Sequence, residues 1–176
     1  MPMFDVSAYP SLTRLRTWFV DDVLPVWLER AWDRESCHFH EGMALDGSVL
    51  PNSKLRIRTA ARMIHVFGDA ERRGVAPTAA AGVAAKAFAA LERDAGASNG
   101  GYVRVIDRTT GDVLDPVVDL YDQACVLLAA ASLHALTGDV QYRKRADDLL
   151  NVLDTRLAAP AGGWAEDDKG TLPRRQ

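Results

Sequence analysis

The sequence is poor in the features that mark metal, redox and nucleic-acid-binding proteins. It has only two cysteines, Cys37 and Cys125, and neither belongs to a CxxC pair, so no zinc or redox motif is indicated. The formal net charge is −3, which gives no electrostatic footprint for nucleic acid. No Gly-rich phosphate loop of the P-loop type is present, so the sequence implies no nucleotide cofactor.

Signals for export or membrane insertion are lacking as well. The first residues, MPMFDVSAYP, have no basic segment followed by an apolar one, so we expect no signal peptide. The most apolar stretch, residues 124–136, contains Ser132 and His134 and is too short to span a bilayer. Since both thiols can stay reduced, these features together predict a cytoplasmic protein with no membrane partner.

What is present is a helical pattern in a chain of globular composition. Hydrophobic residues make up 48% of the 176 residues, enough for one domain with a substantial core. Apolar periodicity and turn residues predict five helices, at about residues 10–32, 52–73, 77–96, 117–137 and 140–158. Pro25 should kink or interrupt the first. The fourth is apolar nearly all round and should be buried on most sides, whereas the fifth is amphipathic.

A loop with an aromatic residue, an acid and a glycine occurs three times along the chain. The three loops read CHFHEGMALDG, GGYVRVIDRTTGD and GGWAEDDKG, and the second should hold a short β-hairpin that turns near Gly111. About 60 residues and two helices separate successive loops, which predicts that all three lie at one end. The second and fourth helices would form an inner layer with their N-termini at that end. Five helices cannot close a ring, so the array is expected to be incomplete.

Three segments, in this order, resemble the N-acylglucosamine 2-epimerase family. They are residues 37–74, with an arginine in the setting AARMIHVFG, then DLYDQACVLLAAASL, and then GGWAEDDKGTLPRRQ. The resemblance implies an all-α fold, an (α/α)6 barrel about twice this length with its active site in the central cavity. Residues 1–176 would form the N-terminal half of that barrel domain, incomplete at the C-terminus and carrying a short β-hairpin in one loop.

The resemblance also implies a chemistry. Family members interconvert N-acylglucosamine and N-acylmannosamine, mannose and glucose units, or aldoses and ketoses, by proton transfer at sugar C2 through an enediolate. The expected partner is thus a small sugar, with no cofactor and no metal. The family's catalytic histidines fall beyond Gln176, so the full-length parent is expected to be an isomerase or epimerase and this chain alone to be inactive. The chain also reads SCHFHE where many relatives have two glycines before the aromatic residue.

Four residues are candidates for the sugar site. Arg62 matches the family arginine that contacts the reacting end of the sugar, and it is the candidate catalytic residue. Tyr121, Trp164 and His65 are candidate substrate-binding residues. Each has a structural alternative: Arg62 and His65 belong to a polar helical stripe that could be solvated, Tyr121 could be a half-buried core residue, and Trp164 could anchor its loop.

Other readings of the polar residues stay open. His38 and His40 would point to one side of an extended segment and could begin a metal site, but no third histidine has ligand spacing, so loop packing around Phe39 is favoured. Asp119 and Asp122 suit the first turn of a helix, and a paired-carboxylate glycoside hydrolase would need a partner across a cleft. A non-catalytic sugar-binding or scaffold module is the main alternative function. The flanks of an open half-barrel should be apolar, which predicts homo-oligomers or association through them.

Overall fold

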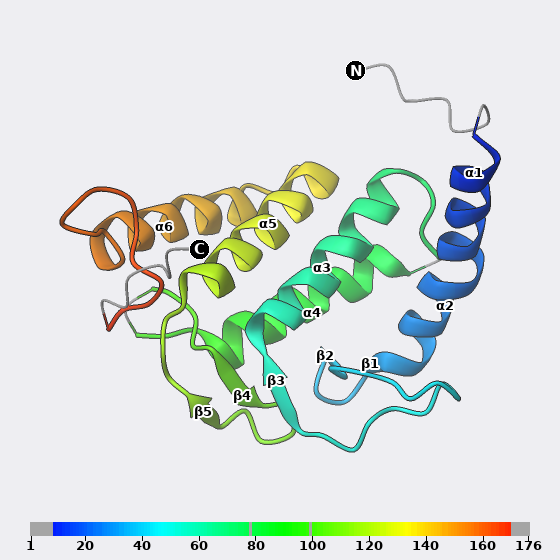
Figure 1. Ribbon diagram of the computed structural model, residues 1–176, viewed down its shortest axis with the longest axis horizontal. Coiled ribbons are helices and arrows are strands. Elements are labelled where there is room, and N and C mark those ends of the chain that lie inside the picture. Colours follow the sequence, from blue (N-terminus) through cyan, green and yellow to red (C-terminus); the bar gives the residue numbers. More distant parts are fainter. Residues whose placement is uncertain (1–8, 78, 99, 170–176) are drawn as a thin grey trace.

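The computed structural model describes residues 9–77, 79–98 and 100–169, which are mostly helical (Figure 1). The first eight residues and the last seven of the GGWAEDDKGTLPRRQ segment lie outside the described residues. The α-helices are α1 (Pro10–Thr17), α2 (Leu24–Val26), α3 (Ile57–Arg72), α4 (Ala80–Ala95), α5 (Leu120–Thr137) and α6 (Val140–Arg156). Of two π-helical segments, η2 (Trp18–Val23) joins α1 to α2 and η3 (Trp27–Ala31) follows α2.

The predicted first helix is one helical run with an irregular centre. Segments α1, η2, α2 and η3 follow one another without a break, and Pro25 lies in the short α2 between the two π-helical segments. Proline has no N–H to donate to the preceding turn, so the hydrogen-bond pattern around it shifts. The expected interruption at Pro25 therefore takes the form of widened turns on both sides of it.

The longer helices form two layers. Helices α3 and α5 pack against each other, α4 packs on α3, and α6 packs on α5 (Figure 1). Gly68 of α3 faces α5, and a Cβ at this position would make ordinary van der Waals contact with Leu133 and Ser132. The core between the layers is apolar; its largest fully buried side chains include Phe39, Phe67, Leu55, Ile57, Ile64, Leu91, Ile106, Leu133 and Leu149. The prediction that the second and fourth helices form the inner layer matches α3 and α5.

Short strands gather at the end where α3 and α5 begin (Figure 1). Strands β4 (Val105–Asp107) and β5 (Val113–Asp115) form the predicted hairpin, and β3 (Lys54–Arg56) pairs antiparallel with β4. The prediction that the second helix starts after Asn52 or Ser53 is therefore wrong, because residues 54–56 are extended by this pairing. A second, two-stranded sheet joins β1 (Trp32–Asp33) to β2 (His38–Phe39).

The internal repeat is visible in backbone hydrogen bonds. The N–H of Ala97 donates to the carbonyl of Gly101 at 2.8 Å, and that of Ala159 donates to Gly163 at 2.9 Å, 62 residues later. Gly100 and Gly162 have φ values of +90° and +89°, a conformation that glycine adopts without strain. These two loops therefore share one backbone structure.

The first loop shares a further hydrogen bond with the other two. The N–H of His40, Val103 and Ala165 donates to the carbonyl at the end of the preceding helical run, at distances of 2.8, 3.0 and 2.7 Å; the acceptors are Ala31, Ala95 and Leu157. The residue just before each donor is the aromatic one, namely Phe39, Tyr102 and Trp164. Phe39 and Tyr102 are fully buried, whereas Trp164 is 44% exposed.

Helix α5 is less buried than its composition suggested. Tyr121, Ala124, Leu128, Ala131 and Ala135 recur at helical spacing and are all exposed, so the prediction of burial on most sides is wrong for this face. A neighbouring element that would cover this stripe is not among the described residues. Of the described helices, α5 is the one whose length and composition would suffice to cross a membrane, and here it packs between α3 and α6.

A second apolar surface lies at the other side of the molecule, on α1 and η2 (Figure 1). Leu12, Leu15, Trp18 and Phe19 are exposed there, with Trp18 at 53%. Leu12, Leu15 and Phe19 belong to the apolar stripe that predicted the first helix, so the periodicity located a helix whose apolar face is open. The structure thus has two uncovered apolar surfaces, one on α1 and η2 and one on α5.

We predict that residues 1–176 self-associate through these two surfaces. Burying one exposed leucine contributes about 1.5–3 kcal/mol, so Leu128→Glu should shift the chain towards monomer. Light scattering on a size-exclusion column measures this. Gln141→Glu, which adds the same charge at an exposed position outside both surfaces, serves as the control and should leave the mass unchanged. A monodisperse monomer for the parent chain would contradict the prediction.

Candidate functional site

The starts of α3 and α5 are fixed by the same backbone hydrogen bond. The N–H of Ile57 donates to the carbonyl of Arg104 at 3.0 Å, and that of Leu120 donates to Glu166 at 2.8 Å. In each case a residue of the following loop holds the first residue of an inner helix. The first turns of both helices therefore lie at the loop-bearing end, with the positive end of each helix dipole.

Arg62 and Tyr121 meet between these two helices. The Nη2 of Arg62 donates a hydrogen bond to the Tyr121 hydroxyl, and the Arg62 guanidinium carbon lies 5.1 Å from the ring centroid of Tyr121. Both side chains are exposed. Among the described residues no carboxylate forms an ion pair with Arg62, so its charge remains available to an anionic group. The structure thus brings together two residues that the sequence proposed separately.

Arg58 and Asp122 form a second contact between the same helices, deeper than the first. The Nε of Arg58 lies 2.9 Å from Oδ1 of Asp122, whose side chain is completely buried. Burial raises the pKa of Asp122 to about 6, against the lowering effect of the Arg58 charge. The guanidinium carbon of Arg58 is 5.7 Å from the Tyr121 ring centroid, so Tyr121 lies between two cations.

Sequence reasoning missed this pair. Arg58 was one member of a polar helical stripe, and Asp122 was explained by the preference of helix starts for acids. The repeat contained a usable signal, because Arg58 and Tyr121 each follow the first residue of an inner helix, at Ile57 and Leu120. Aligning the repeats would have placed Arg58 at the same end as Tyr121.

A cavity of about 540 Å³ opens beside Tyr121, between α5, α6 and the loop that follows α6. Its polar wall comes from Arg58, Asp119, Tyr121 and Glu166 at the helix starts. Its apolar wall is formed by Leu120, Ala124, Leu127, Leu150, Leu153 and Trp164. A concave surface with an apolar wall and a few polar groups at one end suits a small polar ligand that also has C–H faces.

Trp164 contributes an aromatic face to this cavity. Its ring is 44% exposed, and its Nε1 donates a hydrogen bond to Oδ1 of Asp154 at 3.2 Å. Its counterpart Tyr102 is fully buried and receives a hydrogen bond at its hydroxyl from Nε of Arg145 at 2.7 Å. Tyr102 is therefore structural, as the sequence favoured, whereas Trp164 faces solvent within the cavity.

His65 lies away from this cavity. It is half-buried between α3 and α5, and its Nδ1 is 2.6 Å from the hydroxyl oxygen of Ser132. That hydroxyl donates in turn to the carbonyl of Leu128 at 2.8 Å, so the imidazole Nδ1 carries the proton that Ser132 accepts. His65 of α3 therefore has its partner, Ser132, on α5. It lies one turn along α3 from Arg62.

The first loop uses its histidines for packing. His38 is buried with Nε2 2.8 Å from Oδ2 of Asp94, and burial lowers the pKa of His38 despite that carboxylate. The Phe39 ring stacks on Phe67 with centroids 5.3 Å apart. Across the described ranges, no group of three or more histidine, cysteine or acidic side chains is placed to hold a metal ion.

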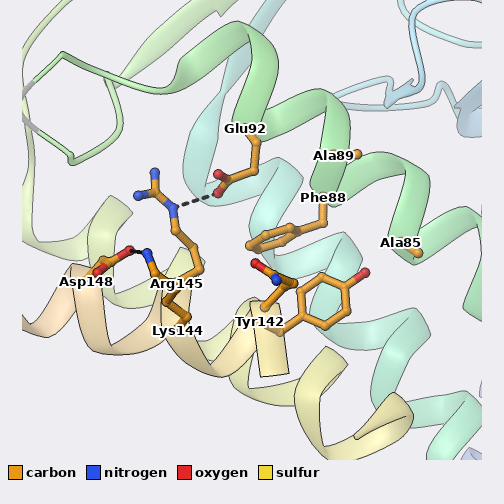
Figure 2. A pocket seen from close by; sticks show the side chains of 9 residues that line it. Ala85, Phe88, Ala89, Glu92, Tyr142, Lys144, Arg145 and Asp148 are labelled. Atoms are coloured by element: carbon orange, nitrogen blue, oxygen red, sulfur yellow. Dashed lines mark hydrogen bonds and ion pairs between the residues drawn. The ribbon is translucent and has the colours of Figure 1, made fainter. Parts of the chain in front are cut away.

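A further groove, of about 460 Å³, separates the outer helices α4 and α6 (Figure 2). Phe88 and Tyr142 meet edge to face in it, with ring centroids 5.4 Å apart. Its charges are paired: Arg145 Nε lies 2.8 Å from Glu92, and Lys144 Nζ lies 3.2 Å from Asp148. Because the cations already have acidic partners, this groove is a weaker candidate for a functional site than the cavity beside Tyr121.

Comparisons with known proteins agree with one another. The family model described as N-acylglucosamine 2-epimerase matches residues 38–176. A mannose-6-phosphate isomerase of Rhizobium meliloti (strain 1021) is 31% identical over 164 residues, which is 90% of this chain and 41% of that protein. The cellobiose 2-epimerase structure from Spirochaeta thermophila DSM 6192 superposes with a TM-score of 0.81 at 22% identity, covering 97% of this chain and 44% of that one.

These comparisons settle the architecture. A D-mannose isomerase structure also superposes, with a TM-score of 0.80 at 20% identity, and this chain covers 42% of it. The chain thus spans less than half the length of the proteins it matches. The fold is one half of an (α/α)6 barrel, as the sequence predicted, with α3 and α5 as inner helices and α4 and α6 as outer helices.

The raised pKa of Asp122 leads to a pH-dependent prediction. Between pH 3.8 and about 6 the folded chain holds a proton on Asp122 that the unfolded chain has lost, so this group's contribution to stability falls as pH rises. Asp122→Asn removes that dependence. The unfolding free energy of the variant relative to the parent should therefore rise by about 1.4 kcal/mol per pH unit across this window.

Urea unfolding at half-unit steps from pH 4 to 7 measures this difference. Asp94→Asn is the matched control, because hydrogen bonds from Arg93 and His38 lower the pKa of Asp94 although burial alone raises it. Because the lowered pKa places the titration of Asp94 at or below its ordinary value of 3.8, the relative stability of this variant should show no comparable rise between pH 4 and 7. A pH-independent difference for Asp122→Asn would show that the carboxyl titrates normally.

Proposed function

Because this chain belongs to the N-acylglucosamine 2-epimerase family, we propose that it forms one side of the sugar site in a carbohydrate 2-epimerase or aldose–ketose isomerase. The observation that carries the proposal is the Arg62–Tyr121 pair, which joins the second turn of α3 to the first turn of α5 beside a cavity that Tyr121 lines. The relatives named for mannose make mannose or a mannose derivative the first substrate to test.

The proposed reaction is proton transfer at C2 of an open-chain sugar. A base removes the C2 proton, and the electron pair of that C–H bond moves towards the C1 carbonyl, so an enediolate forms with negative charge on oxygen. Return of a proton to the other face of C2 gives the epimer. Delivery of a proton to C1, with transfer of the O2 proton to O1, gives the ketose. The acid and base are the histidines that the family resemblance places beyond Gln176.

Arg62 is proposed as the group that stabilises the enediolate. Its guanidinium is held by Tyr121 and has no acidic partner among the residues described, so its donors can meet the developing oxyanion. One preorganised donor of this kind contributes about 3 kcal/mol to a transition state. The interaction strengthens as charge develops on oxygen, which is the condition for catalysis rather than simple binding.

The remaining candidates have binding roles in this proposal. The Tyr121 hydroxyl, which accepts from Arg62, can donate its own proton to a sugar hydroxyl. The exposed ring of Trp164 offers an apolar face to sugar C–H groups. His65 was also proposed for substrate binding; its hydrogen bond to Ser132 holds it between α3 and α5, and it does not line the cavity.

A paired-carboxylate glycoside hydrolase is less well supported. Asp119 caps α5 by accepting from the N–H groups of Tyr121 and Asp122, and Asp122 is buried in the first turn of the same helix. Two acids in one helical turn cannot flank a glycosidic bond from opposite sides. The alternative of a non-catalytic sugar-binding module predicts that sugar binds without exchange at C2.

Hydrogen exchange tests the proposal directly. The complete polypeptide is incubated with mannose, N-acetylmannosamine and cellobiose in D2O, and deuterium at C2 is followed by NMR. Incorporation into at least one sugar is expected, since the enediolate takes a proton from solvent-equilibrated groups. Residues 1–176 alone should bind sugar without exchange. Binding without exchange by the complete polypeptide would instead support the non-catalytic module.

Substitution of Arg62 tests its catalytic role. Arg62→Gln should lower the exchange rate at C2 on the order of 100-fold, because it removes one charged donor to the oxyanion. Arg72→Gln changes an arginine on the same helix that is paired with Asp69 and lies away from the cavity, and it should leave the rate unchanged. Equal rates for Arg62→Gln and the parent would remove Arg62 from the mechanism.

A further inference from the structure

The part of the site that the function above leaves unexplained is the buried ion pair under Tyr121. We propose that Arg58 is a second substrate-binding cation of the sugar site, and that Asp122 is the positioning residue that directs the Arg58 guanidinium into the cavity. This inference rests on the proposed function and extends it to two residues that neither the sequence motifs nor the relatives assign.

Arg58 has donors available to a ligand. Its Nε faces Asp122 at 2.9 Å, while its side chain is 30% exposed and lines the cavity together with Tyr121. The described residues give the two Nη groups of Arg58 no hydrogen-bond acceptor. A guanidinium presents its donors in a planar fork that matches two neighbouring oxygens. The chemistry therefore fits adjacent oxygen atoms of an open-chain sugar or its enediolate.

Besides approaching the backbone N–H of Arg58 at the start of α3, Asp122 has one evident partner, the side chain of Arg58. Its carboxylate is fully buried, and neither oxygen has a well-directed hydrogen bond among the described residues. A carboxylate buried in this way is costly unless a cation lies beside it. Arg58 is that cation, from the facing helix. The charge of Asp122 thus restricts Arg58 to rotamers that keep Nε against the core, which leaves the Nη end to point towards the cavity.

The repeat supports a shared role for Arg58 and Tyr121. Each is the second residue of an inner helix, and each helix start is held by the same bond to the following loop. The Tyr121 ring lies within 5.7 Å of the Arg58 guanidinium carbon. Equivalent positions of the two repeats therefore present a phenol and a guanidinium side by side. Arg62 does not line the cavity itself, but it contacts Tyr121 and adds a third donor beside these two residues.

The test is a double-mutant cycle in sugar affinity. Calorimetric titration with mannose is carried out on the parent, Arg58→Gln, Asp122→Asn and the double variant. Arg58→Gln should weaken binding about tenfold, as expected for loss of a charged hydrogen bond, and Asp122→Asn should weaken it nearly as much. The double variant should bind no more weakly than Arg58→Gln, because Asp122 acts through Arg58.

A matched pair on the same helix provides the control. Arg72 and Asp69 of α3 form an ion pair away from the cavity, with Nη2 and Oδ1 2.6 Å apart. Arg72→Gln and Asp69→Asn should leave mannose affinity unchanged. The conservative variant Asp122→Glu, which keeps the charge, should recover part of the affinity that Asp122→Asn loses.

A second readout separates positioning from a purely structural role. NMR of the arginine Nε–H groups should show that Asp122→Asn makes the Arg58 side chain mobile and leaves that of Arg62 unchanged. Parent-like affinity for Arg58→Gln, or additive losses in the double variant, would overturn the proposal while the Arg62-based function stands. If the parent bound none of mannose, N-acetylmannosamine and cellobiose, the proposed function would fail and the role of Arg58 with it.

Discussion

The structure depends on the backbone hydrogen bond that ties each inner helix to the loop after the next outer helix. It joins Ile57 to Arg104 and Leu120 to Glu166, so each helix begins at a fixed height relative to a loop nearly fifty residues away. The first N–H groups of a helix have no partner within the helix, so each of these two needs an acceptor from elsewhere in the chain. The constraint places the second residues of α3 and α5 at one end and side by side. Arg58 and Tyr121 therefore share a cavity although 63 positions separate them.

Local signals predicted the elements that local interactions stabilise. The predicted α6 starts at the observed residue, Val140, because Asp139 caps it through a bond to the N–H of Gln141. Strand β3 could not be predicted in this way, since Lys54–Arg56 is extended only because it pairs with Val105–Asp107. The exposed face of α5 also escaped prediction. Composition reports how apolar a helix is, whereas burial depends on which neighbours are present, and the described chain supplies them on two sides only.

The candidate site likewise contains residues that the sequence identified and residues that it did not. Family resemblance singled out Arg62 and Tyr121 one at a time, but their contact depends on the packing of α3 against α5, which no spacing within either segment encodes. A polar stripe on a helix cannot reveal whether it faces water or a neighbouring helix. Arg58 and Asp122 were overlooked for that reason. The preference of helix starts for acids explains Asp122 from the sequence alone, and only the facing helix shows that its carboxylate is buried.

The loop aromatics show how such a barrel could change its ligand without refolding. Phe39, Tyr102 and Trp164 follow helical runs through the same turn, yet the first two rings are sealed in the interior and the third is open to the cavity. The turn is held by main-chain bonds, so it does not depend on which ring it carries. Position 164 can therefore vary in size and polarity at little cost to the scaffold. At position 102 the same change would remove a fully buried ring and the hydroxyl that accepts a hydrogen bond from Arg145. The repeated loop thus carries a replaceable contact at position 164 and an indispensable one at position 102.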